Sequence, residues 1–160
     1  MVEPRSLMSD QPQESGFRSD ALAILVEGTM VELSSGLGEI GELPPFEEVR
    51  RPESGLVMVR GRAGGDGQPF NLGEATVSRA AIRLASGETG FGYVLGRDLE
   101  RSRLIAICDA LLQHDDYREP IEQHVLRPIR ARRIDETNLL AQRTAATRVD
   151  FFTLVRGEDA

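Results

Sequence analysis

The feature that most constrains the fold is one continuous block, residues 55–98, in which apolar runs alternate with glycine-rich turns. Residues 56–63 begin with an apolar run that includes the β-branched Val57 and Val59, and three glycines follow within residues 64–67, a pattern that predicts a strand and then a turn. Residues 75–84 and 91–95 are two further apolar runs, and the short glycine-containing segment between them predicts a hairpin. The block therefore predicts a small sheet that is mainly antiparallel.

Helical patterns flank this block on both sides. Apolar residues recur at helical spacing over residues 17–33, which predicts one amphipathic N-terminal helix followed by a linker. Asp98 is suited to cap the next helix, and residues 118–148 predict a further helical region that is interrupted near Arg127-Pro128. With an edge strand over residues 46–51, the expected fold is α+β: three to five strands packed against helices at one face.

The two ends of the chain differ in character. Residues 1–15 are polar and we expect them to be disordered, whereas residues 16–160 form a single domain that ends in an extended tail, residues 149–160. The tail carries large apolar side chains, which termini rarely leave uncovered. We therefore expect a partner protein or a second copy of the chain to cover five of them: Val149, Phe151, Phe152, Leu154 and Val155.

The charge of the chain limits its function. The formal net charge is −7, which argues against general binding of nucleic acid or of an anionic membrane. All 19 basic residues are arginines, so lysine-based Schiff-base chemistry and a phosphate loop ending in Gly-Lys-Ser/Thr are excluded. The chain has no secretory signal pattern and no apolar stretch near the roughly 18 residues of a membrane span. We expect a cytoplasmic protein.

Catalytic and metal-binding residues are not evident in the sequence. The one cysteine, Cys108, lies on the apolar stripe of a predicted helix and His114 lies on a different face, so we expect a core residue rather than a nucleophile. His114 and His124 are too few for a convincing metal cluster, and Asp109, Asp115 and Asp116 lack the spacing of a calcium loop. We assign no catalytic residue, no metal ligand and no cofactor bound by this chain.

The arginines of the sheet are the best candidates for binding an anion or a partner. Strand alternation places Arg60 and Arg62 on one face of their strand, and Arg79 and Arg83 on one face of another. If the strands are neighbours, four guanidinium groups converge near the glycine turn, where Glu74, Asp66 or Asp98 are possible acid partners. Ion pairs or partner contacts are the preferred interpretation and ligand binding is the alternative. The full candidate set is Arg60, Arg62, Gly64, Gly65, Arg79, Arg83 and Arg97.

Four motifs in order give the chain a resemblance to a known family. They are GLVMVRGRAGGDGQPFNLGEATVSRAAIRL at residues 55–84, GYVLGRD at 92–98, CDALLQ at 108–113 and RVDFFTLVRGED at 148–159. FRSDALAILVEG, residues 17–28, is a looser match. The chain resembles the PhnG family, the G subunit of the bacterial carbon–phosphorus lyase system, over most of its length beyond about residue 17. Ser19-Asp20-Ala21-Leu22 departs from the family pattern.

The resemblance implies an essential companion subunit without an assigned catalytic residue. Such a subunit works in α-D-ribose 1-methylphosphonate 5-triphosphate synthase, which displaces adenine from MgATP by a phosphonate, so MgATP is a substrate of the complex. The implied partners are the H, I, J and L subunits, most intimately the I subunit. Two alternatives remain open: a small-molecule binder that presents phosphonate or ribose triphosphate, and a purely structural assembly protein.

Overall fold

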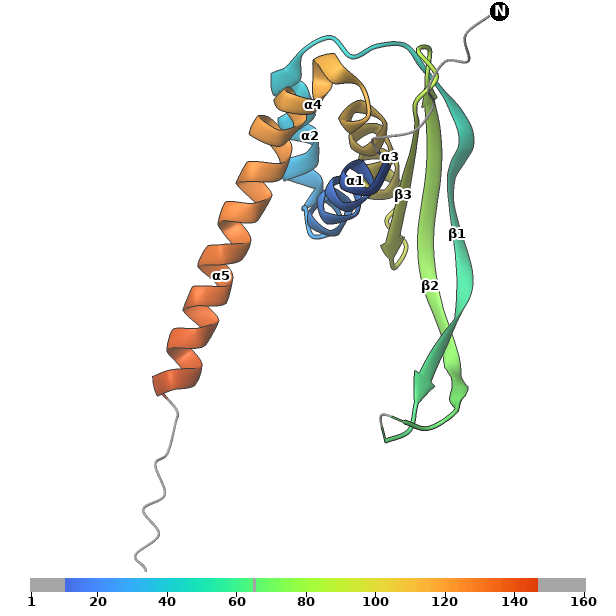
Figure 1. The fold of residues 1–160 in the computed structure, drawn as a ribbon, viewed down its shortest axis with the longest axis vertical. Coiled ribbons are helices and arrows are strands. Elements are labelled where there is room, and N and C mark those ends of the chain that lie inside the picture. Colours follow the sequence, from blue (N-terminus) through green and yellow to red (C-terminus); the bar gives the residue numbers. More distant parts are fainter. Residues whose placement is uncertain (1–10, 65, 147–160) are drawn as a thin grey trace, which may run out of the picture. The chain divides into compact units, whose positions relative to one another are not determined.

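The computed structural model describes residues 11–64 and 66–146, with side chains from 16 to 145 apart from residue 65 (Figure 1). It is an α+β fold with one three-stranded antiparallel sheet in the order β1-β2-β3, which confirms the predicted class. The chain divides into two compact units between Arg130 and Ala131, and each is described by itself. The elements are α1 (Gln11–Leu25), α2 (Met30–Ile40), β1 (Phe46–Arg62), β2 (Pro69–Leu84), β3 (Thr89–Leu95), α3 (Leu99–Leu112), α4 (Asp115–Ile121), the π-helix η1 (Glu122–Leu126) and α5 (Arg127–Ala146).

The sheet contains the predicted hairpin and one longer strand than expected. β2 and β3 pair antiparallel from Arg83 opposite Thr89 to Val77 opposite Leu95, which confirms the hairpin. The two segments predicted before it, residues 46–51 and 56–63, form a single strand, β1, because shifts in register absorb the region around Pro52. Pro52 is tolerated there because β1 is an edge strand, where a missing N–H breaks no ladder.

The N-terminal prediction of one helix over residues 17–33 is wrong. The structure has two helices, and α2 starts after Thr29, whose side chain accepts from the Glu32 N–H at 3.2 Å while the Glu32 carboxylate accepts from the Thr29 N–H at 2.8 Å. This capping box starts a new helix after the turn at Gly28. α2 then runs to Ile40, through the segment expected to be a linker, and α1 begins at Gln11, inside the segment expected to be disordered.

Helix α3 lies directly on strand β3. Asp98 caps α3, as predicted, by accepting from the Arg101 N–H at 3.1 Å. The two strand glycines that face the helix, Gly90 and Gly92, leave no room for a side chain: an added Cβ would overlap the carbonyl oxygens of Ala106 and Ser102 respectively. This close approach buries most of α3, which supplies the centre of a core shared with α1, α2, β2 and η1.

The C-terminal region is interrupted where the sequence predicted. The helical path from α4 changes to the π-helix η1 at Glu122 and returns to α-helix at Arg127, immediately before Pro128. In residues 131–145, every side chain except Arg132 is exposed. Arg132 pairs with Glu136 at 2.9 Å, one helical turn later. The predicted strand-like tail after Val149 lies outside the described residues.

Candidate interaction surface and anion-binding residues

The four strand arginines do not form one site. β1 and β2 are neighbours, as the hypothesis required, but Arg79 lies opposite Glu53 and Arg60 lies opposite Asn71. Asn71 and Arg79 are eight residues apart along β2, which corresponds to about 26 Å at roughly 3.3 Å per residue. The predicted convergence of guanidinium groups near the glycine turn therefore does not occur.

Arg79 and Arg83 take part in ion pairs across the sheet. Arg79 Nε lies 2.8 Å from Glu53 Oε1, and the same oxygen accepts from Arg50 Nη1 at 2.9 Å. Arg83 Nη1 lies 3.4 Å from Glu47 Oε1. Both carboxylates lie directly opposite their arginines on β1. Ion pairing was the preferred interpretation, but the partners are these two glutamates rather than Glu74, Asp66 or Asp98.

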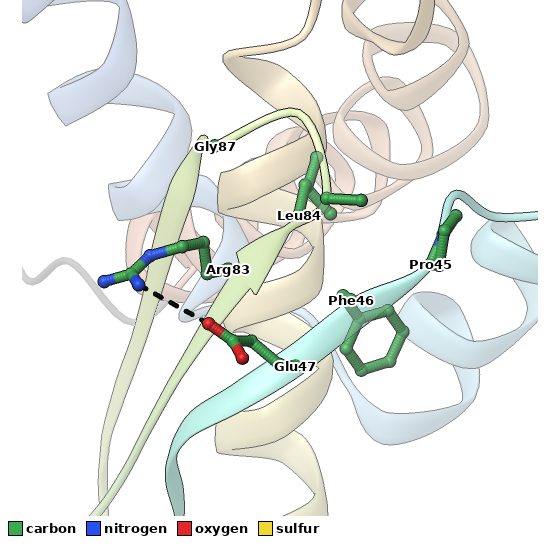
Figure 2. A pocket seen from close by; sticks show the side chains of 7 residues that line it. Pro45, Phe46, Glu47, Arg83, Leu84 and Gly87 are labelled. Atoms are coloured by element: carbon green, nitrogen blue, oxygen red, sulfur yellow. Dashed lines mark hydrogen bonds and ion pairs between the residues drawn. The ribbon is translucent and has the colours of Figure 1, made fainter.

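Arg83 and Glu47 also line an open pocket of about 330 Å³ at the end of the sheet. Figure 2 shows the Arg83 guanidinium directed to the Glu47 carboxylate, with Phe46 and Pro45 beside it. The remaining lining comes from Leu84 at the end of β2 and from Ala85 and Gly87 in the turn that follows. The Glu47 carboxylate beside the guanidinium disfavours an anionic ligand here, because it offsets the positive charge.

Arg60, Arg62 and Gly64 lie at the far end of the β1–β2 hairpin. Gly64 has φ +67°, which the turn requires. The N–H groups of Asp66 and Gly67 donate to the carbonyls of Gly64 at 2.9 Å and Ala63 at 3.2 Å, so the turn uses these donors itself. Gly65 lies outside the described residues.

Three of the candidate arginines have no acid partner in the described part of the chain. They are Arg60 and Arg62 on β1 and Arg97 in the turn after β3. All three side chains are exposed. An exposed guanidinium without a carboxylate remains available to an anion or to a partner surface.

A buried ion pair that the sequence did not reveal joins α1, β3 and α3. Asp109 is fully buried and accepts from Arg18 Nε at 2.8 Å, from Arg18 Nη2 at 2.7 Å and from the Phe91 N–H at 2.8 Å. Arg18 also donates to the Thr89 carbonyl at 3.2 Å. The hydrogen bond to Asp109 raises the pKa of Arg18, and the opposite charge adds to the effect although partial burial opposes it. The only signal in the sequence is an acid within the apolar run of α3.

The cysteine and the histidines have structural surroundings. Cys108 is fully buried, and this loss of hydration raises the pKa of its thiol to about 12, so the prediction of a core residue is confirmed. His114 caps α4 by accepting from the Asp116 N–H at 3.3 Å. His124 Nδ1 lies 2.7 Å from Glu39 Oε2. Across residues 16–64 and 66–145, no three His, Cys, Asp or Glu side chains are grouped to hold a metal ion.

Large apolar side chains remain exposed on the sheet. On β3, Phe91, Tyr93 and Leu95 alternate with the residues that face α3 and therefore lie on the opposite face. Further exposed apolar residues follow on β1 and β2: Leu56, Met58, Val59, Phe70 and Leu72. No helix in the described residues is both long and apolar enough to span a membrane. In the described residues, exposed apolar side chains on the sheet and arginines without acid partners are typical of a protein that associates with other proteins.

Comparison with known proteins identifies the family. The family model described as phosphonate metabolism protein PhnG matches residues 17–157. The chain is 52% identical over 143 residues to the α-D-ribose 1-methylphosphonate 5-triphosphate synthase subunit PhnG of Rhizobium meliloti (strain 1021), covering 89% of this chain and 90% of that protein. The chain belongs to the PhnG family.

Proposed function

We propose that the chain is the G subunit of an α-D-ribose 1-methylphosphonate 5-triphosphate synthase, the enzyme that displaces adenine from MgATP by a phosphonate. The observation that carries this proposal is the 52% identity to a subunit of that synthase along nearly the whole of both chains. A match over 89% of the chain extends far beyond any one motif, which supports the same role for the chain as a whole.

The subunit is accessory in this proposal: the complex requires it, but its own residues do not perform the chemistry. The surroundings of the reactive groups support this. The Cys108 thiol is buried with a raised pKa, one histidine caps a helix and the other pairs with a glutamate. Arg79 and Arg83 are already paired with carboxylates. The chain is expected to bind no cofactor of its own, and MgATP is a substrate of the complex.

The proposed partners are the H, I and L subunits during synthesis, with the I subunit in closest contact, and the J subunit in the larger carbon–phosphorus lyase assembly. The uncovered apolar side chains of the sheet support association with large partners, because obligate interfaces are more apolar than other protein surface. The cytoplasm is the expected location, because the proposed substrate is MgATP.

The alternative role is a binder that presents phosphonate or ribose triphosphate to the other subunits. The observation in its favour is the exposure of Arg60, Arg62 and Arg97 without acid partners in the described part of the chain. Titration calorimetry of the isolated chain with MgATP and with methylphosphonate separates the two roles. The accessory subunit gives no binding heat, whereas the binder gives a saturable signal that R60A/R62A abolishes.

The decisive experiment is adenine release from MgATP and methylphosphonate by purified H, I and L subunits, with and without this chain. The accessory role requires that release depends strictly on the chain. Full release in its absence overturns the proposal. A purely structural assembly protein, the third role, predicts that chain variants alter the amount of complex but never the rate per complex, which is measured by normalising release to complex isolated by gel filtration.

A further inference from the structure

The β1–β2 hairpin continues beyond the sheet as a two-stranded arm. β3 makes its last pair at Leu95 opposite Val77, whereas β1 and β2 stay paired down to Arg62 opposite Pro69. We call residues 56–76 the arm; Figure 1 shows β1 and β2 running past the end of β3. The hydrophobic core contains none of the described residues of the arm. A two-stranded ribbon is marginally stable by itself in water, so its length calls for a covering surface.

Both faces of the arm carry exposed apolar side chains. Strand alternation places Leu56 and Met58 on one face, and their side chains are 64% and 52% exposed. Val59 lies on the other face together with Phe70, which pairs with Gly61. Leu72 joins that second face, because its Cδ1 atom occupies the space over Gly61, 2.7 Å from where a Cβ would be. A ribbon with apolar side chains on both sides fits a groove that encloses it better than it fits a flat surface.

The charges of the arm indicate the chemistry of that groove. Arg60 and Arg62 follow Met58 on the first face, opposite Asn71 and Pro69, while the carboxylate Glu74 of the same face lies opposite Met58. Within the described residues no carboxylate pairs with either guanidinium. Burying an arginine without a counter-charge is costly, so a surface that covers the arm must supply carboxylates at this end.

We propose that the arm inserts into a groove of another synthase subunit, with apolar walls around residues 56–59 and 70–72 and carboxylates opposite Arg60 and Arg62. This rests on the proposed function, which places the chain in a complex with such subunits. Protein is favoured over nucleic acid because the chain carries a net charge of −7 and because apolar side chains flank both arginines. A second copy of the chain is the competing occupant.

The test measures binding of the full-length chain to a tagged I subunit in the presence of H and L, by biolayer interferometry. Three arm variants test separate features. M58E/L72E tests the apolar faces and R60E/R62E tests the charge. Replacement of residues 58–74 by Asn-Gly tests the arm itself. In the last variant Val57 and Ala75, which already pair, flank a two-residue turn. We expect at least about tenfold weaker binding for the double variants and loss of binding for the shortened chain.

Matched controls make the same changes outside the arm. V31E introduces a charge at an apolar side chain that is 70% exposed on α2, and R51E/R127E reverses two exposed arginines. These controls are expected to bind within about twofold of the unaltered chain, since surface changes away from an interface have small effects. Circular dichroism and thermal unfolding establish that every variant is folded, which is expected because the arm is outside the core.

The outcomes separate this inference from the proposed function. If the unaltered chain binds and supports adenine release while the folded arm variants bind equally well, the arm inference is wrong and the proposed function stands. If the unaltered chain neither binds nor is needed for adenine release, the proposed function fails. If sedimentation velocity shows a dimer of the chain that the shortened arm abolishes while capture by the I subunit is unchanged, the arm pairs with a second copy, which also overturns the inference.

Discussion

At the scale of single residues, the buried carboxylate of Asp109 holds together elements that are distant in sequence. It accepts from Arg18 on α1 and from the Phe91 N–H on β3. Asp109→Ala leaves a partly buried guanidinium without its counter-charge and a strand N–H without an acceptor, and we expect it to lower the free energy of unfolding by about 2–4 kcal/mol. Urea unfolding followed by circular dichroism measures this loss.

The control for this prediction is Asp116→Ala. The Asp116 side chain is 86% exposed, so this change is expected to alter the free energy of unfolding by less than about 1 kcal/mol. Equal effects of the two substitutions would contradict a stabilising role for the Arg18–Asp109 pair. Arg18→Ala should destabilise the chain at least as much as Asp109→Ala, because it leaves a fully buried carboxylate without its counter-charge.

The candidate site shows the limit of prediction from single residues. The prediction that Arg79 and Arg83 share one face of their strand is correct, because the alternation of side chains along a strand is a local property. Which acid faces each arginine depends on register, and the register of β1 against β2 shifts between Glu48 and Arg50, between Arg50 and Glu53, and between Val59 and Arg60. Nothing in the local sequence specifies those shifts, so neither the Glu53 partner nor the distance to Arg60 could be predicted.

At the scale of the elements, the packing of α3 on β3 depends on glycine. A methyl group at position 92 would overlap the Ser102 carbonyl, which belongs to the helix backbone and cannot turn aside. Gly92→Ala therefore has to displace the helix, and we expect it to destabilise the chain by about 1–3 kcal/mol.

Gly38→Ala on α2 is the opposite case. Nothing lies within 4 Å of the added methyl group, and we expect the free energy of unfolding to increase by about 0.5–1 kcal/mol. Thermal unfolding of both variants measures these changes in stability. The packing argument would be contradicted if Gly92→Ala caused no loss of stability.

The elements themselves were predicted unevenly, and the reason is physical. The hairpin and the capped start of α3 follow from signals within a few residues, a glycine turn and Asp98. The N-terminal break was missed because apolar spacing continues across it, although Thr29 and Glu32 have the spacing of a capping box. The Ile129 side chain also packs close to Gly28: its Cδ1 atom lies 2.7 Å from where a Cβ at Gly28 would be. Ile129 is 101 positions away in the sequence, so the residues around Gly28 do not reveal this contact.

At the scale of the whole molecule, apolar surface is distributed between a closed core and uncovered segments. Large side chains in the core of the first unit are almost fully buried, among them Leu25, Leu33, Ile82, Ile105 and Leu111. By contrast, in residues 131–145 of the second unit Ile134, Leu139 and Leu140 remain exposed. A helix that is polar or exposed all round gains little stability from its own chain, so its conformation depends on what it meets in an assembly.

The last prediction follows from this distribution. Residues 149–160 lie outside the described residues and carry five large apolar side chains in seven positions, Val149 to Val155. We expect deletion of residues 149–160 to abolish assembly with the other subunits while leaving the thermal unfolding of the first unit unchanged, because among the described residues the core includes none beyond Ile129. Gel filtration of the co-expressed subunits measures assembly, and the matched control replaces only the last three residues, 158–160. A truncated chain that still assembles fully would show that the tail is not an interface and would leave the arm and the exposed face of β3 as the surfaces that hold the complex together.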